Sequence, residues 1–291
     1  MLRSRLAAYG ALMRLDRPVG TLLLLWPTLA ALWIAAEGVP DWPILLAFTG
    51  GTFVMRAAGC VANDIADRNF DRHVDRTRNR PLATGQVAVT EAVVLLLLLG
   101  VFGLAIVLTL NLLTLAFAAG GVVIALIYPL MKRVTYLPQV VLGAAFSWGI
   151  PMSFTAITNA LPEAAWLMFT ASLLWIVAYD TQYAMVDRRD DIQVGIKSTA
   201  ILFGSADTLM IGVLQFCAWL LFLLLGFSLE FQHAYFVALA AIAGLFGYQQ
   251  RLMSDRDREQ EVCFAAFRNN TWVGFALFAG VVLEYALDGS M

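Results

Sequence analysis

Aspartates gather in two short motifs that could hold a metal ion. The first motif contains Asp67 and Asp71, and the second contains Asp187 and Asp191, so that each pair is four residues apart. Side chains with this spacing lie on one face of an α-helix. Asn63 lies four residues before Asp67 and adds another oxygen to that face. Each helix end can therefore direct two or three oxygen ligands to one point.

Carboxylates that converge in this way need a counter-ion. Two of them about 4 Å apart repel by up to ~4 kcal/mol at an effective dielectric constant of 20. Oxygen ligands without histidine or cysteine are typical of Mg²⁺ rather than zinc or copper. Because Mg²⁺ usually binds through a few carboxylates and substrate phosphates, the motifs predict a phosphate-bearing substrate. The alternative is a solvated acidic surface that pairs with neighbouring arginines.

Four basic residues near the motifs are placed to reach a diphosphate bridged by Mg²⁺. Taken singly, each is equally compatible with the positive charge of cytoplasmic loops. The four residues are Arg76, Arg80, Lys132 and Lys197.

Arg56 differs from these residues because it lies inside an apolar segment. It precedes Asn63 by seven residues, which is roughly 10 Å along a helix, and shares a helical face with Asn63. A charge near the bilayer centre costs about 2.5–3.5 kcal/mol. We expect Arg56 to face a cavity beneath the acids, where its guanidinium would bind a carboxylate. The alternative is pairing with an acid of another helix, or extension to the membrane surface.

The composition indicates that these motifs lie in a membrane protein. Of the 291 residues, 60% are hydrophobic and 14% are charged, whereas a soluble domain has roughly 25% charged residues. A formal net charge of −2 argues against a nucleic-acid partner. The three cysteines form no spaced cluster, which argues against a disulfide framework and a zinc site. No obligate protein partner is evident either.

Nine segments are apolar and close to the length of about 20 residues that spans a bilayer. Pro151 interrupts one of these segments and Glu284 lies within another, so that the sequence does not fix where these two segments end. Lys and Arg precede the first segment and follow the even-numbered ones, and the connections after segments one, three, five and seven contain none. Because positive charge marks the cytoplasmic side, the N-terminus is predicted to lie inside and the C-terminus outside. The segments are 19–36, 43–63, 90–109, 112–130, 138–157, 163–181, 207–227, 234–250 and 270–287.

The connections predict how the mouth of the helical bundle is closed. Two inner connections, 64–89 and 182–206, are long and charged, and we expect them to form a cytoplasmic cap. Residues 1–17 are basic and amphipathic, which predicts an interfacial segment. Residues 1–291 are expected to form a single polytopic membrane domain. Four spans separate the two acidic motifs, so that both helix ends point the same way, unlike the inverted repeats of many transporters.

A metal–diphosphate site above an apolar cavity suits a substrate that is part lipid and part diphosphate, such as a prenyl diphosphate. Mg²⁺ and basic residues would withdraw charge from the departing diphosphate, and an allylic cation would form in a pocket sheltered from water. If Arg56 binds a carboxylate, the acceptor that attacks this cation is an aromatic acid.

Over essentially its whole length the chain resembles the UbiA superfamily of intramembrane aromatic prenyltransferases. The acidic motifs carry the superfamily resemblance, and the N-terminal block and the 183–204 block resemble its hydroxybenzoate branch. The segments that carry it are MRLDRPVGTLLLLWPTLAALW (13–33), NDIADRNFD (63–71), RTRNRPLATG (76–85), YPLMKR (128–133), DTQYAMVDRRDD (180–191), GIKSTAILFG (195–204) and CFAAFRNNTWVG (263–274).

The resemblance implies an all-α membrane protein with nine helices around a central cavity that opens laterally to lipid. It implies polyprenyl transfer to C3 of 4-hydroxybenzoate with release of diphosphate, a step of ubiquinone biosynthesis in the bacterial inner membrane. Arg56 matches the family's basic residue near the aromatic acid. Asp71 and Asp191 are the catalytic candidates. The matching Mg²⁺–diphosphate ligands are Asn63, Asp67, Asp71, Asp187 and Asp191.

Other interpretations stay open at this point. Tyr128 and Tyr183 are candidate contacts for the diphosphate or the acceptor, and a packing role is equally compatible with the sequence. The acceptor could instead be homogentisate, dihydroxynaphthoate or haem. A cation-coupled transporter is the alternative from another functional class.

Overall fold

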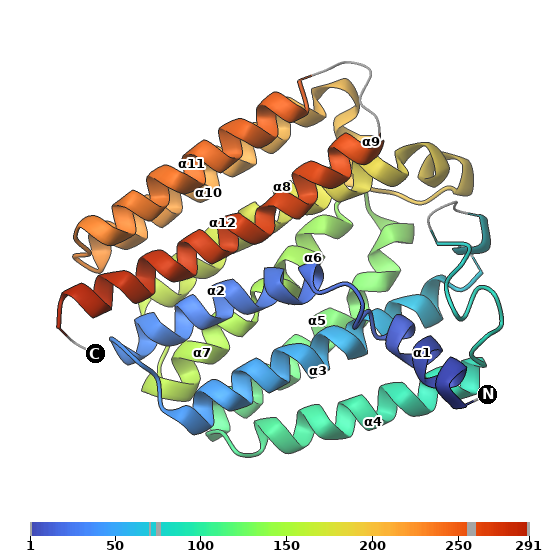
Figure 1. The fold of residues 1–291 in the computed structure, drawn as a ribbon, viewed down its shortest axis with the longest axis horizontal. Helices are drawn as coiled ribbons and strands as arrows, with labels where there is room; N and C mark the ends of the chain where they lie inside the picture. Colours follow the sequence, from blue (N-terminus) through green and yellow to red (C-terminus); the bar gives the residue numbers. More distant parts are fainter. Residues whose placement is uncertain (1, 70, 74–76, 255–259, 290–291) are drawn as a thin grey trace.

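In the computed structural model, which describes residues 2–69, 71–73, 77–254 and 260–289, all regular structure is helical (Figure 1). The predicted all-α class is therefore confirmed for these residues. The elements are α1 (Leu2–Leu12), α2 (Val19–Ala36), α3 (Trp42–Asp67), η1 (Asp71–His73), α4 (Val89–Val107), α5 (Leu112–Val134), α6 (Pro138–Ser147), α7 (Gly149–Thr158), α8 (Glu163–Val194), α9 (Thr199–Phe203), η2 (Gly204–Ala206), α10 (Asp207–Ser228), α11 (His233–Leu252) and α12 (Gln260–Leu287).

Eight helical units of the described chain are long and apolar enough to cross a membrane. They are α2, α3, α4, α5, α6 with α7, α8, α9 with α10, and α12. The remaining expected span, 234–250, forms α11, which has 20 residues but is not among the eight. Its polar last turns, with Gln249, Gln250 and Arg251, lower its mean hydropathy.

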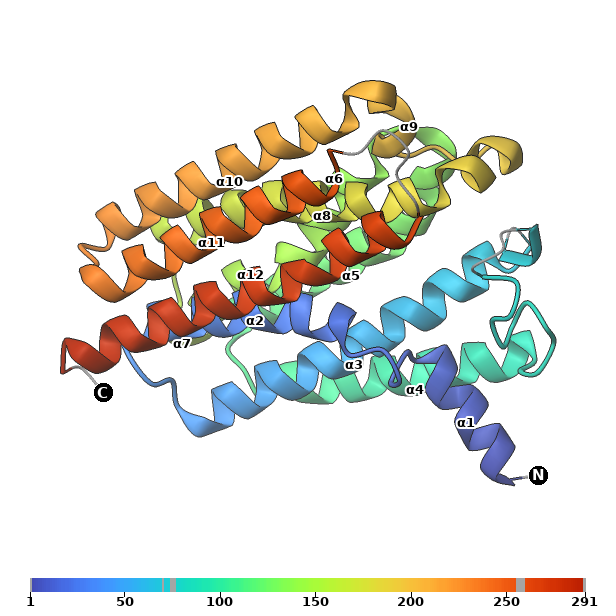
Figure 2. The ribbon, with the colours of Figure 1, turned by 45° about the horizontal axis from the view of Figure 1, so that its top comes forward.

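The helices form a bundle in which α10 packs on α8, α11 on α12, and α12 on α2. The pair α3 and α4 lies on the other side of α2, next to α1 (Figures 1 and 2). The connection that follows α3 and the end of α8 lie at the same end of the bundle, close to the N-terminus, whereas the C-terminus lies at the opposite end (Figure 1). This arrangement places the two acidic motifs at one end of the molecule.

The main hydrophobic core lies among α2, α8, α10, α11 and α12. Trp175, Phe222 and Tyr235 are fully buried there. Helix α4 is different because Ala92 is its one buried residue, and large side chains such as Leu97 and Phe102 are exposed. An exposed apolar face of this size is expected for a helix that contacts lipid.

A buried polar network joins α8, α10, α11 and α12. Gln182 and Gln215 each donate to the Oε1 atom of Gln249, at 3.0 and 2.7 Å. Asn270 donates to Gln182 at 2.9 Å, and the indole of Trp175 donates to Asn270 at 2.8 Å. Hydrogen bonds between buried amides help hold helices together where lipid replaces water. The network therefore holds α8, which carries the second acidic motif, in a defined rotation.

The predicted span 138–157 is broken three residues before Pro151. Helix α6 ends at Ser147 and α7 begins at Gly149, with Trp148 between them. A proline lacks an N–H and clashes with the carbonyl four residues earlier, here that of Ser147, so that the first helix ends at this residue. Trp148 donates from its indole to the carbonyl of Phe117 on α5, at 2.7 Å, and this bond ties the break to a neighbouring helix.

Glu284 of α12 caps the N-terminus of α11. Its carboxylate accepts hydrogen bonds from the backbone N–H groups of Gln232 and Tyr235, the latter at 2.8 Å. The first N–H groups of a helix have no partner within the helix, and a carboxylate there also interacts favourably with the helix dipole. This contact explains an acid that the sequence analysis left without a role inside the last apolar segment.

Replacing Glu284 with Ala is expected to destabilise the protein by about 1–3 kcal/mol, because the buried N–H group of Tyr235 and the N–H group of Gln232 lose their acceptor. Thermal unfolding in detergent measures the loss, and Glu284→Gln should retain part of the stability because one oxygen remains. Glu163→Ala, at an exposed first-turn glutamate of α8, is the matched control. Equal midpoints for Glu284→Ala and the control would contradict the cap.

Candidate functional site

A cavity of about 1720 Å³ lies within the bundle, and both acidic motifs line it. Typical small-molecule pockets have roughly 300–1,000 Å³, so that this cavity is large enough for a long apolar substrate. Its walls come from α2 to α8 and α12. The motif residues that line it are Asn63, Asp67, Asp71, Asp187 and Asp191.

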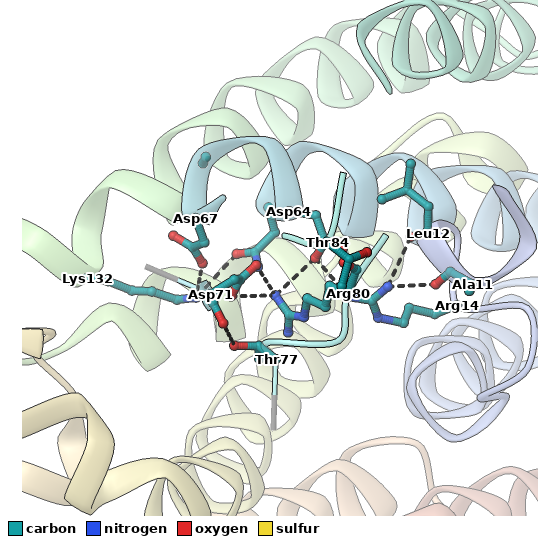
Figure 3. A network of polar contacts seen from close by, with 12 residues as sticks. Ala11, Leu12, Arg14, Asp64, Asp67, Asp71, Thr77, Arg80, Thr84 and Lys132 are labelled. Carbon is teal, nitrogen blue, oxygen red and sulfur yellow. Dashed lines mark hydrogen bonds and ion pairs between the residues drawn. The ribbon is translucent and has the colours of Figure 1, made fainter. Parts of the chain in front are cut away.

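Arg80 forms ion pairs with two acids of the first motif. Its Nη1 atom contacts both oxygens of Asp71, at 3.0 and 2.9 Å, and Oδ1 of Asp64 at 3.0 Å (Figure 3). Arg14 adds two bonds of 2.8 Å to the oxygens of Asp64. Thr77 donates to the carbonyl of Asp71 at 2.9 Å. The loop after α3 is therefore held against the helix end by paired charges.

Lys132, at the end of α5, contacts the same motif from another helix. Its Nζ atom lies 3.0 Å from Oδ2 of Asp67 (Figure 3). The same atom lies 3.3 Å from Oδ1 of Asn63. The ammonium group also lies 5.4 Å from the centre of the Tyr128 ring, a cation–π distance. Two residues singled out in the sequence, Lys132 and Tyr128, are thus brought to the acids by the end of α5.

The acids of the first motif are buried and interact electrostatically with one another. Burial raises the pKa of the Asp71 carboxyl; the Arg80 guanidinium opposes this rise, and the charges of Asp64 and Asp67 add to it. Three acids thus share a site with little solvent. Ion pairs with Arg14, Arg80 and Lys132 balance their charges in this structure.

The two motifs differ in their backbone. Asp187 and Asp191 lie on one continuous helix, since α8 extends to Val194 and the first part of 182–206 is helical. Asp67 is the last residue of α3, and Asp71 lies beyond it in η1. The expectation of one helical face is therefore wrong for Asp71. A change of direction after Asp67, rather than helical spacing, carries Asp71 to the cavity.

Of the remaining phosphate-binding candidates, Lys197 and Tyr183 line the cavity. Lys197 donates from Nζ to the carbonyl of Val134 at 3.2 Å and lies 5.4 Å from the Tyr136 ring, so that its side chain is held against the end of α5. Tyr183 packs against Phe267 with ring centres 4.8 Å apart. Arg76 lies outside the described residues.

Arg56 lines the cavity on the side of α3 that faces α2 and α6. Its guanidinium lies 5.6 Å from the centre of the Phe146 ring, and the side chain passes so close to Gly20 that a Cβ there would lie 2.8 Å from Nε. No carboxylate of the described chain forms an ion pair with Arg56. Pairing with an acid of another helix is therefore excluded within these residues.

The sequence analysis missed the roles of Arg14 and Asp64. Arg14 was one of the charges that set the topology, and Asp64 was an unassigned member of the first motif. Asp64 is fully buried, and Arg14 adopts a positive φ of 59° that turns its side chain back to the carbonyl of Ala11 at 2.6 Å. The pair is 50 residues apart in the chain, and no local pattern signals such a contact.

The donor set of the cavity fits a divalent ion that also binds phosphate. All the candidate ligands are oxygen donors, as Mg²⁺ prefers. In the part of the chain that the structure describes, no three His, Cys, Asp or Glu residues form a ready-made metal group. Basic side chains pair with the first-motif acids instead. A metal with few protein ligands and several phosphate ligands matches this arrangement better than a closed protein cage does.

The chain has close relatives of known name. It is 54% identical over 284 residues to 4-hydroxybenzoate octaprenyltransferase of Coxiella burnetii (strain RSA 493 / Nine Mile phase I), with 98% of each chain covered. It is 54% identical over 283 residues to the protein of the same name from Aeromonas hydrophila, with 97% of this chain and 98% of the relative covered.

Solved structures share the fold. A UbiA homolog from Aeropyrum pernix K1 superposes with a TM-score of 0.81 at 23% identity, covering 92% of this chain and 98% of that one. A UbiA homolog from Archaeoglobus fulgidus bound to GPP and Mg²⁺ gives 0.69 at 18% identity, with 93% and 99% covered. The profile of the UbiA prenyltransferase family matches residues 24–271. With these similarities and its multi-pass helical structure, the chain belongs to the UbiA prenyltransferase family.

Proposed function

We propose that the protein transfers a polyprenyl group from its diphosphate to C3 of 4-hydroxybenzoate, releasing diphosphate in a step of ubiquinone biosynthesis. One observation of the structure carries the proposal: two acidic motifs line one large apolar cavity that is also lined by Arg56, which forms no ion pair within the described residues. The names of relatives that are 54% identical over nearly the whole chain support the same reaction.

The head of the donor would bind at the end of the bundle where the acids lie. Asn63, Asp67, Asp71, Asp187 and Asp191 would hold Mg²⁺, which when bound neutralises the charge that develops on the leaving diphosphate. The basic side chains already near the acids would bind the remaining phosphate oxygens. These are Arg80 and Lys132, together with Lys197 and Arg76 from the sequence prediction; Asp71 and Asp191 are the proposed catalytic residues.

The tail of the donor would extend along the wall formed by α4 and α5. Gly100, Gly103 and Gly121 line the cavity there together with aliphatic side chains such as Val107. Gly100 leaves room for a flexible isoprenoid chain, since a Cβ there would meet nothing within 4 Å, and the exposed side chains of α4 beyond its first turn are apolar. We propose a lateral opening at this wall, through which a donor enters from the bilayer.

The acceptor would lie deeper, with its carboxylate on Arg56. The arginine fork matches a carboxylate, and Phe146 provides an aromatic surface beside it. The apolar walls of the cavity would limit the access of water and so protect an allylic cation from hydrolysis. The ring carbon ortho to the hydroxyl would then attack this cation, which forms as the C–O bond to the diphosphate breaks. Loss of the C3 proton to solvent or to the released diphosphate would restore the aromatic ring.

Gly20→Ala tests the place of Arg56 without removing its charge. The added Cβ would overlap the guanidinium, and the flexible arginine tip would move while the backbone of α2 stays. We expect the KM for 4-hydroxybenzoate to rise by about 10-fold, the equivalent of 1.4 kcal/mol, at an unchanged KM for the donor. Gly10→Ala, where a Cβ meets nothing within 4 Å, is the control; equal effects of the two changes would contradict the prediction.

We propose that α11 crosses the membrane as the ninth span, with the N-terminus in the cytoplasm and the C-terminus in the periplasm. The two termini lie at opposite ends of the bundle (Figure 1), and an odd number of crossings accounts for this, whereas eight would return the chain to its starting side. The positive charges at the acidic end agree with a cytoplasmic orientation. The 64–89 and 182–206 regions would cap this end.

The test is incubation of membranes that contain the protein with labelled 4-hydroxybenzoate, prenyl diphosphates of several lengths, and either Mg²⁺ or a chelator. We expect a prenylated product that requires Mg²⁺ and forms in detergent without an ion gradient. Homogentisate and dihydroxynaphthoate are the competing acceptors. Faster product formation from either of them, or no metal-dependent product at all, would overturn the proposed function.

A further inference from the structure

Tyr179 carries a buried hydroxyl group without a hydrogen-bond partner in the described structure. The residue is 1% exposed. Its ring is held edge-on by Trp175 at 5.4 Å and Phe267 at 5.9 Å. Buried tyrosines usually place their hydroxyl on a partner, as Tyr235 does by donating to the carbonyl of Phe222 at 2.9 Å. The packing of the protein therefore uses the ring of Tyr179 and not its oxygen.

Tyr179 and Arg56 both lie below the acidic motifs, on different helices. It precedes Asp187 by eight residues on α8, a rise of about 12 Å, and Arg56 precedes Asp67 by eleven residues on α3, about 16 Å. Both helices run toward the acidic end of the bundle (Figure 1). Both residues line the same cavity, and the Tyr179 phenol lies within electrostatic range of two charges, those of Asp180 and Arg56.

We propose that Tyr179 is a binding residue for the aromatic acceptor, and that its hydroxyl donates a hydrogen bond to the carboxylate that Arg56 holds. This inference rests on the proposed function and adds the second polar contact of the acceptor site. A carboxylate has about four acceptor positions, of which an arginine fork uses two. A phenol O–H satisfies a third, and the pair selects aromatic acids over neutral phenols.

Tyr179→Phe separates this role from a structural one. Removing a hydroxyl that has no partner should leave the unfolding midpoint of the substrate-free protein unchanged or slightly higher. The same change should raise the KM for 4-hydroxybenzoate by about 10-fold or more, as expected when a hydrogen bond to a charged group is lost. The KM for the prenyl diphosphate should stay the same.

Tyr235→Phe is the matched control. It removes a buried tyrosine hydroxyl that does have a partner, so that it should lower the unfolding midpoint and leave both KM values unchanged. An unchanged KM for the acid in Tyr179→Phe, an equal rise for both substrates, or a midpoint loss as large as that of the control would each overturn the inference.

Measurements on the wild-type protein distinguish a failure of the role of Tyr179 from a failure of the proposed function. If it forms the prenylated product but Tyr179→Phe behaves like the wild type, only the role of Tyr179 is wrong. If the wild type neither binds 4-hydroxybenzoate in detergent, measured by calorimetry, nor prenylates it, the proposed function and the inference are both overturned.

Discussion

Asp191→Asn is expected to lower prenyl transfer to 4-hydroxybenzoate by at least about 10²–10³-fold, the loss typical of removing one preorganised group that stabilises transition-state charge. The substitution keeps the size of the side chain but removes the charge that would hold the metal ion on the α8 side of the cavity. Initial rates with labelled acceptor, normalised to the amount of inserted protein, measure the effect. Asp71→Asn should cause a comparable loss from the α3 side.

Asp190→Asn is the matched control for this prediction. Asp190 is the neighbouring residue on the same helix and does not line the cavity, whereas Asp191 does. We expect near-normal turnover in Asp190→Asn, together with normal insertion of all three variants. Substantial activity in Asp71→Asn or Asp191→Asn would show that the ligand assignment is wrong.

Arg56→Ala is expected to raise the KM for 4-hydroxybenzoate by about 10–100-fold, because hydrogen bonds to charged groups are worth about 1.5–3 kcal/mol. The KM for the prenyl diphosphate should change little, since the diphosphate binds at the acidic end of the cavity. Arg56→Lys should recover part of the affinity, because an ammonium retains the charge but not the planar fork. Steady-state kinetics with each substrate varied in turn measures this difference.

Arg68→Ala, at the C-terminal end of the helix that carries Arg56, provides the comparison. Its side chain is exposed, donates to the carbonyl of Ile65 at 2.9 Å and does not line the cavity. Both KM values should be unaffected by this change. If Arg56→Ala raised the two KM values equally, or if Arg68→Ala produced the same pattern, Arg56 would not be the anchor for the acid.

Much of the fold follows from local features of the sequence. The length of each apolar run predicted eight of the helical units, because a bilayer requires about 20 apolar residues of every span. The run at 234–250 is less clear, since its helix includes Gln249, Gln250 and Arg251 and its hydropathy is correspondingly lower. Four-residue spacing was sufficient to place Asn63 with Asp67, and Asp187 with Asp191, because both pairs lie within continuous helices.

Other parts of the site depend on contacts between distant segments. Asp64 on α3 forms an ion pair with Arg14, which lies in the turn before the first span. Lys132 reaches Asp67 from α5. Helical periodicity carries no information about which of several arginines or lysines an acid meets across the bundle. It also cannot show that α3 ends at Asp67, so that Asp71 enters the cavity from a different backbone direction.

The sequence by itself determined the helical class, most of the spans and the oxygen chemistry of the two motifs, because these depend on local hydrophobicity and on spacing along one helix. Only the tertiary structure decided that both motifs share a cavity, that Glu284 caps α11 and that the Tyr179 hydroxyl has no hydrogen-bond partner among the described residues. These features depend on the packing of helices that are far apart in the chain, where a rotation of one helix changes which side chains meet.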